Sequence, residues 1–266
     1  MPTCRIGELD LHYEIHGAGD PIVLIAGYTC DSTFWDAVVP PLARRYRLIA
    51  FDNRAVGRTR DDGRPFTIDT MAADAVGLIR HLGLSRPGLV GQSMGGAIVQ
   101  TMLASHPEAC GPCAIVDSTH AFSRTTLLAL DTLLALRKAG ADLDLLVDTA
   151  LPWFAGREWM DVPENVAGLK AALARHPAPQ SLADQERQLQ ALRTFRAGMH
   201  NKPWRYPTLI VSATEDVITT PAEGQALATS LRGRYAEVPG GHQTPVEQAA
   251  RLATLLDTFF AGRQAG

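Results

Sequence analysis

Long apolar runs are missing from this sequence of 266 residues. No stretch approaches the roughly 20 consecutive apolar residues that a membrane-spanning helix needs, so no membrane association is expected. The first 17 residues also lack the basic segment, apolar segment and cleavage site of a secretory leader. We therefore expect a cytoplasmic protein whose N-terminal segment is part of the fold.

Clustered positive charge is also absent. The 25 basic residues are scattered among 28 acidic ones, and the net charge is -3. Nucleic acids are bound through clustered basic residues, so we do not expect a nucleic-acid partner. A chain that is 46% apolar and 20% charged has the composition of an ordinary globular enzyme with a small-molecule substrate. A homodimer is left open.

Cysteine is scarce, and the four in the chain are too few for a disulfide framework. Two of them belong to the thioredoxin-like tetrapeptide Cys110-Gly111-Pro112-Cys113. A redox pair of that kind lies where a strand leads into a helix, because the helix N-terminus lowers the pKa of the first thiol. Here a helical segment precedes the tetrapeptide and an apolar strand follows it. We interpret the Gly-Pro pair as a turn.

Short apolar runs alternate with segments of helical periodicity along most of the chain. This alternation predicts a mostly parallel sheet with helices on both faces, in one large domain that carries an insertion. The expected strands are 3–9 and 11–16, which form a hairpin, followed by 21–26, 47–51, 88–91, 113–116, 208–211 and 234–238. The expected helices of this layer are 33–45, 68–82, 94–105, 222–231 and 246–260.

The alternation stops between residues 120 and 202, where about four helical stretches follow one another without a strand. Leucines at helical spacing fill this region and are most simply packing residues. We expect residues 120–202 to form an inserted helical cap, and residues 1–119 together with 203–266 to form the core.

The strongest motif is a glycine-rich turn between a predicted strand and a predicted helix, Gly91-Gln92-Ser93-Met94-Gly95. A turn in this context is a nucleophile elbow, in which the glycines allow the chain to bend sharply and hold the serine in a strained conformation. The serine hydroxyl then lies beside the positive end of a helix, which favours developing negative charge. Ser93 is therefore the predicted nucleophile.

A serine hydroxyl needs a base within hydrogen-bond reach. His242 is the best candidate because it follows the last predicted strand, at the edge where open α/β sheets build their sites. His120, at the start of the predicted cap, is a distant second. The acid that orients the base should follow a strand between the two, and Asp216 does so just before a Thr-Thr-Pro helix start. Asp117, which ends the preceding strand, is a competing candidate.

An oxyanion hole requires two backbone N–H donors aimed at the tetrahedral oxygen. One is expected from Met94, directly after the nucleophile, and the other from Tyr28, in the loop after the predicted strand 21–26. The residues expected around the substrate come from that loop, the cap and the acid loop. They are Gly27, Phe122, Trp153, Phe154 and Val217.

With these motifs the sequence resembles the α/β-hydrolase superfamily over nearly its whole length. It is most similar to the capped branch that holds small esterases, enol-lactone hydrolases, cofactor-free haloperoxidases and C–C bond hydrolases. Residues 51–59 look like the Asp-x-Arg-Gly-x-Gly-x-Ser/Thr segment of this branch, and residues 245–248 look like its helix start after the histidine. Three positions depart from the pattern of this branch. Ala55 stands where the branch usually has glycine, Gln92 where it often has histidine, and Ala26 where it usually has histidine.

The resemblance implies an α/β-hydrolase fold with an eight-stranded sheet, and it implies neither a metal nor an organic cofactor. It also implies hydrolysis of a carboxylic ester, lactone or thioester through an acyl-serine intermediate. Ser93 at the elbow argues against dehalogenases and epoxide hydrolases, which attack through a carboxylate. Gln243 stands where C–C hydrolases commonly carry tryptophan, which makes C–C bond hydrolysis less favoured without eliminating it. Perhydrolase activity and a slow-turnover receptor role are also left open.

Overall fold

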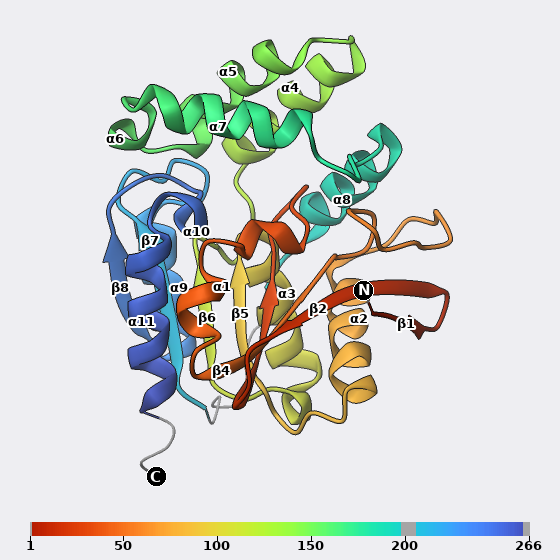
Figure 1. Cartoon of the computed structure of the whole chain (residues 1–266), viewed down its shortest axis with the longest axis vertical. Helices are drawn as coiled ribbons and strands as arrows, with labels where there is room; N and C mark the ends of the chain where they lie inside the picture. Colours follow the sequence, from red (N-terminus) through yellow and green to blue (C-terminus); the bar gives the residue numbers. More distant parts are fainter. Residues whose placement is uncertain (1, 198–205, 263–266) are drawn as a thin grey trace.

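The computed structural model describes residues 2–197 and 206–262 and is built around one eight-stranded sheet (Figure 1). The strand order is β1-β2-β4-β3-β5-β6-β7-β8. β1 and β2 pair antiparallel, as do β2 and β4, and all the other pairs are parallel. The strands are β1 (Thr3–Ile6), β2 (Leu9–His16), β3 (Asp20–Ile25), β4 (Tyr46–Phe51), β5 (Gly88–Gln92), β6 (Cys113–Val116), β7 (Thr208–Ala213) and β8 (Arg234–Val238). The expected mostly parallel sheet is confirmed.

Helices cover both faces of this sheet. Alternate residues of β3 belong to different apolar clusters, because successive side chains of a strand point to opposite faces. One cluster includes buried residues of α2 (Ile68–His81), α3 (Met94–Ser105) and α9 (Pro221–Leu231). The other includes buried residues of α1 (Val39–Leu42) and α11 (Ala249–Ala261). The central strands are therefore buried on both sides, which explains their nearly continuous apolar sequences.

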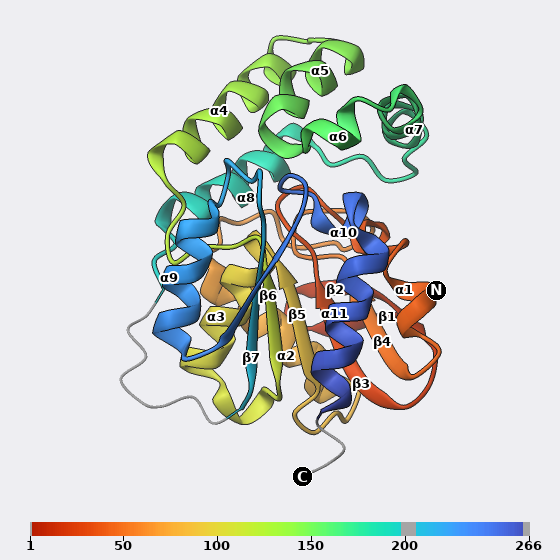
Figure 2. The same cartoon turned by 90° about the vertical axis from the view of Figure 1, so that its left-hand side faces the viewer.

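Between β6 and residue 197, where the described part of this segment ends, five helices lie beyond the carboxyl ends of the parallel strands (Figures 1 and 2). They are α4 (Arg124–Lys138), α5 (Leu143–Phe154), α6 (Arg157–Met160), α7 (Pro163–Ala174) and α8 (Leu182–Thr194). We call these helices and their connections the cap. The sequence predicts about four helical stretches here, and the short α6 makes the fifth. The last residues of the expected 120–202 segment lie outside the described residues.

Two expected helices are interrupted. The predicted helix 33–45 is a 3-10 turn, η1 (Ser32–Trp35), followed by the single-turn α1. Pro40 and Pro41 lie in the first turn of α1, where a missing N–H costs no helical bond but further extension toward the N-terminus is blocked. The predicted helix 246–260 is divided into α10 (Thr244–Glu247) and α11, because Gln248 between them has a non-helical φ of -128°. Within residues 2–197 and 206–262 no helix is long and apolar enough to cross a membrane.

Candidate active site

Ser93 lies at the sharp turn between β5 and α3. Its φ of 53° and ψ of -114° form a conformation that an L-residue adopts only under strain. A Cβ on Gly91 would overlap the carbonyl of Gly95, and a Cβ on Gly95 would overlap the carbonyl of Ile25. Backbone packing therefore requires both glycines, and the turn leaves Ser93 as the residue that precedes the first turn of α3.

A hydrogen-bonded chain of side chains runs from Ser93 through His242 to Asp216. The His242 Nε2 atom lies 2.9 Å from Ser93 Oγ, and its Nδ1 atom lies 2.7 Å from Asp216 Oδ2. The three residues follow β5, β8 and β7, whose carboxyl ends meet at one edge of the parallel sheet. All three side chains are buried. The structure thus brings together the nucleophile, base and acid that the sequence predicts.

The Asp216 carboxylate is fixed by its own loop. Its Oδ1 atom accepts hydrogen bonds from the backbone N–H groups of Ile218 and Thr219, at 2.8 Å and 2.9 Å. Its Oδ2 atom accepts one from the Thr219 hydroxyl at 2.9 Å. Thr219 is not among the predicted site residues, although the Asp-x-x-Thr spacing at the start of a predicted helix is a visible signal for it.

Charge at His242 is governed by two opposing effects. Burial lowers the pKa of the imidazole, but the hydrogen-bonded carboxylate of Asp216 outweighs this effect and the pKa of His242 is raised. The arrangement stabilises the imidazolium that forms when the histidine accepts a proton. The backbone of His242 is also held, because Gln92 Nε2 donates to its carbonyl at 2.8 Å.

Asp117, the competing acid, lies close by but has different partners. It is completely buried, and its Oδ1 atom accepts a hydrogen bond from the backbone N–H of Ala213 at 2.9 Å. Burial, reinforced by the nearby negative charge of Asp216, raises the pKa of Asp117 to about 8. A carboxyl group with that pKa is largely neutral at pH 7 and is poorly suited to stabilise an imidazolium.

The loop after β3 passes beside the nucleophile. A Cβ on Gly27 would lie 3.3 Å from Ser93 Cβ, so the backbone here is in contact with the serine side chain. Tyr28 follows Gly27, and the completely buried Met94 follows Ser93. Among the described residues, neither the N–H of Tyr28 nor that of Met94 has a protein acceptor. Backbone donors this deep in a protein are normally paired, so two free ones beside Ser93 are available to a ligand.

The aromatic residues expected around the substrate occupy different surroundings. The Phe154 ring lies edge-on to the His242 imidazole, with ring centroids 5.7 Å apart, and covers the base from the cap. Phe122 is buried against Phe195, with centroids 6.1 Å apart, and has the contacts of a packing residue. Val217 is exposed.

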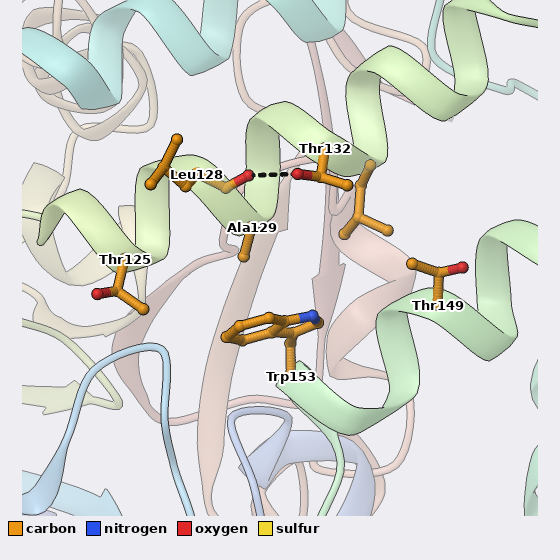
Figure 3. A pocket seen from close by; sticks show the side chains of 7 residues that line it. Thr125, Leu128, Ala129, Thr132, Thr149 and Trp153 are labelled. Carbon is orange, nitrogen blue, oxygen red and sulfur yellow. Dashed lines mark hydrogen bonds between the residues drawn. The ribbon is translucent and has the colours of Figure 1, made fainter.

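Trp153 is partly exposed and lines an open cavity of about 230 Å³ between α4 and α5 (Figure 3). Its ring lies beneath α4 and faces the side chain of Ala129. The cavity is lined by Thr125, Leu128, Ala129, Thr132, Leu133, Thr149 and Trp153. Ser93, His242 and Asp216 are not among these lining residues.

The cap and the histidine loop meet at glycines. A Cβ on Gly156 would lie 2.6 Å from Gly240 Cα, and a Cβ on Gly241 would lie 2.6 Å from the carbonyl carbon of Ala155. Glu247 joins the two segments, because its Oε2 atom accepts a hydrogen bond from the N–H of Gly156 at 2.9 Å and another from the N–H of Gly241 at 3.0 Å. In the sequence Glu247 is recognisable only as part of the helix start after the histidine.

Metal and thiol chemistry have little support in the part of the chain that the structure describes. No group of three or more His, Cys, Asp or Glu side chains there is arranged to hold a metal ion. None of the four cysteines, all of which lie in the described part of the chain, forms a disulfide bond. Burial raises the pKa of Cys110. The first thiol of the Cys-x-x-Cys pair therefore ionises less readily than an ordinary thiol, whereas a redox-active thiol ionises more readily.

A family model described as the alpha/beta hydrolase fold matches residues 20–248, and the chain belongs to this family. Its relatives are named as several kinds of hydrolase and as a bromoperoxidase. The chain is 28% identical over 271 residues to the non-heme bromoperoxidase BpoC of Mycobacterium tuberculosis, with coverage of 97% of this chain and 100% of the relative. The crystal structure of BpoC superimposes with a TM-score of 0.85 at 27% identity, over 95% of this chain and 96% of that one.

Two further relatives carry the names of hydrolases. The carbamate hydrolase RutD of Azorhizobium caulinodans is 28% identical over 250 residues, which cover 91% of each chain. The 2-hydroxymuconate semialdehyde hydrolase of a Pseudomonas species is 28% identical over 257 residues, with coverage of 92% of this chain and 88% of the relative. Family and relatives together support a hydrolase that acts on a small molecule.

Proposed function

We propose that this protein is a serine hydrolase that cleaves a carboxylic ester, lactone or thioester through an acyl-Ser93 intermediate. The observation that carries the proposal is the His242 imidazole, which is hydrogen-bonded to the Ser93 hydroxyl on one side and to the Asp216 carboxylate on the other. A serine hydroxyl is a weak nucleophile until an oriented base accepts its proton.

The proposed reaction has two stages. In the first, His242 takes the Ser93 proton as Oγ attacks the substrate carbonyl, and then passes that proton to the leaving group. The N–H groups of Tyr28 and Met94 bind the oxyanion of the tetrahedral intermediate, and Asp216 stabilises the imidazolium. In the second stage His242 takes a proton from water as the water attacks the acyl group, and it returns that proton to Ser93 Oγ as the bond between Oγ and the acyl group breaks and the acid leaves.

Substrate selection is proposed to depend on the helices above the site. We assign residues 120–202 to a cap and residues 1–119 and 203–266 to the catalytic core. Ser93 is only 6% exposed, so the reacting carbonyl has to enter between the two. Phe154 is the cap residue placed to contact it, because its ring lies against His242. Gly27 forms the opposite wall, and Trp153 and Val217 are placed farther out.

The test compares turnover of a short-acyl nitrophenyl ester by wild type and Ser93→Ala, with intact-mass detection of a covalent adduct. We expect kcat to fall by roughly 10³-fold or more in the variant, because the nucleophile is lost while binding is kept. An acyl or fluorophosphonate adduct should form on wild type and not on Ser93→Ala. Wild type that neither turns over nor forms an adduct would contradict the proposed function.

C–C bond hydrolysis is the second candidate, favoured by the similarity to 2-hydroxymuconate semialdehyde hydrolase. The same serine, base and oxyanion donors would serve that reaction. Adduct formation at Ser93 without steady turnover of simple esters or thioesters would move this candidate, or a slow-turnover receptor, ahead of the esterase assignment.

A further inference from the structure

Gln188 is a completely buried amide on the cap helix α8. Its Oε1 atom accepts a hydrogen bond from the backbone N–H of Thr29 at 3.0 Å and one from Gln180 Nε2 at 3.1 Å. Its Nε2 atom donates to the carbonyl of Arg54 at 2.8 Å. Donors face the oxygen and an acceptor faces the nitrogen, so the amide orientation is fixed by its surroundings. A buried polar group satisfied in this way holds its neighbours rigidly.

The residue that Gln188 holds is in a strained conformation. Thr29 follows Tyr28 in a tight turn that is closed by a hydrogen bond from the N–H of Cys30 to the carbonyl of Gly27 at 3.3 Å. Its φ is 64°, in the left-handed region that a β-branched residue rarely adopts. Strain of this kind persists only where the surrounding structure maintains it. Gln188 supplies the acceptor for the N–H of this strained residue.

We propose that Gln188 is a positioning residue that preorganises the oxyanion hole from the cap. By holding the Thr29 N–H it keeps the turn in its strained form, and the turn aims the N–H of Tyr28 at the reacting carbonyl. The proposal rests on the proposed function. Oxyanion donors contribute most when they are oriented before the reaction begins, so the loss of Gln188 lowers kcat more than it raises KM.

The same amide reaches a second strained turn of the core. Arg54, whose carbonyl binds Gln188, precedes Ala55, which has a φ of 65° where the family pattern has glycine. The Ala55 carbonyl accepts from Gln180 Nε2 at 2.7 Å, so two cap amides hold both left-handed turns. A cap that is displaced from the core releases the oxyanion loop as well as uncovering the site.

The test is Gln188→Met, which keeps the length of the side chain and removes its amide. We expect kcat for the nitrophenyl ester to fall about 10- to 100-fold with KM changed less than about threefold, since complete removal of one oxyanion donor costs about 10²- to 10³-fold. The inhibition constant of a trifluoromethyl ketone, which forms a tetrahedral adduct on Ser93, should rise by a similar factor. Thermal unfolding is measured in parallel.

Gln185→Met is the matched control. Gln185 is a buried glutamine on the same helix, and its side chain accepts a hydrogen bond from Arg137 within the cap rather than from the oxyanion loop. It should show a similar loss of thermal stability with kcat and the ketone inhibition constant near wild type. If Gln188→Met matches this control in all three measurements, Gln188 is only a packing residue and the proposal is wrong.

A double-mutant cycle tests the route through Thr29. Glycine adopts a positive φ without strain, so in a Thr29→Gly background Gln188→Met should lower kcat less than about threefold. If Gln188→Met lowers kcat by the same factor in both backgrounds, Gln188 does not act through Thr29. Should Gln188→Met fail to fold, Gln180→Ala replaces it as the test, because Gln180 is only partly buried and is one partner of the Gln188 oxygen. Gln180→Ala should still lower kcat at constant KM, and an unchanged kcat would overturn the proposal. Wild type without turnover or a Ser93 adduct would instead contradict the proposed function itself.

Discussion

Two buried aspartates follow neighbouring strands of this sheet, and at the scale of single residues they differ in their hydrogen-bond partners. Asp216 is bonded to His242 at 2.7 Å, whereas Asp117 is bonded to a backbone N–H at 2.9 Å. Position in the chain alone left both as candidates for the acid. The loop after β7 favours Asp216, because it carries that carboxylate to within 2.7 Å of the imidazole.

Asparagine at each position tests this distinction. In Asp216→Asn we expect kcat to fall about 10³- to 10⁴-fold, because the amide favours the wrong tautomer of the histidine. Burial lowers the pKa of His242 and the Asp216 carboxylate raises it, so the variant should have a lower pKa at His242. The histidine acts as a base only when neutral. The acid limb of kcat/KM should therefore move to lower pH, which a pH–rate profile measures.

Asp117→Asn is the matched variant in this comparison. Its neutral side chain resembles the protonated carboxyl group, so kcat should remain within about threefold of wild type at pH 7. An inactive Asp117→Asn beside an active Asp216→Asn would exchange the roles of the two residues.

At the scale of elements, the meeting of the cap with the histidine loop depends on Glu247. One carboxylate oxygen binds the last residue before α6 and the residue before His242, so the seating of the cap and the position of the base share one contact. The glycines on both sides allow this close approach. Glu247 also lies near enough to raise the pKa of His242, although less than Asp216 does.

Replacing Glu247 should separate its two effects. Glu247→Gln keeps an acceptor for both N–H groups but removes the charge, so the acid limb of kcat/KM should move to lower pH with little loss of stability. Glu247→Ala also removes the acceptor, and the free energy of unfolding should fall by about 1–3 kcal/mol because buried donors are left unpaired. Urea unfolding and pH–rate profiles measure the two effects.

Glu215→Gln provides the comparison, because Glu215 accepts the N–H of the next cap residue, Arg157, at 3.2 Å but its carboxylate makes no such bond to the histidine loop. The acid limb of kcat/KM for Glu215→Gln should match that of wild type. Identical pH–rate profiles for wild type, Glu247→Gln and Glu215→Gln would show that Glu247 has no electrostatic effect on His242.

The elements that the sequence predicts correctly are those with a strong local signal. The buried strands are continuous apolar runs, and the elbow is defined by five consecutive residues. The interrupted helices show where periodicity misleads. In residues 33–45 the apolar spacing is helical, but Pro40 and Pro41 prevent α1 from extending toward its N-terminus. Apolar spacing reports which face is buried, whereas backbone donors decide how far a helix extends.

At the scale of the whole molecule, what the sequence could not reveal lies between distant segments. Gln188 and Thr29 are 159 positions apart, and Glu247 and Gly156 are 91 positions apart. Neither glutamine nor glutamate in a helix carries a local signal for such a partner. The cap is joined to the core by further contacts of this kind, such as the ion pair from Arg187 to the buried side chain of Asp61 at 2.8 Å. The sequence predicts a cap but not the residues that bind it to the catalytic loops.

The whole molecule should also respond to pH through Asp117. The pKa of its carboxyl group is raised to about 8, whereas in an unfolded chain it is about 4. Between these values the native state holds a proton that the unfolded state has lost, so the free energy of unfolding decreases as pH rises. One proton contributes about 1.4 kcal/mol per pH unit to this slope.

Asp117→Asn removes this proton without adding a charge, and it leaves the other titrating groups in place. The difference in unfolding free energy, variant minus wild type, should therefore increase from pH 5 to about pH 8 and become constant above it. Urea unfolding at unit pH intervals measures the difference. His242, whose raised pKa also favours the native state at low pH, is present in both proteins and largely cancels. A difference that does not vary with pH would mean that Asp117 is already ionised in the native protein, and two buried carboxylates would then face one imidazole.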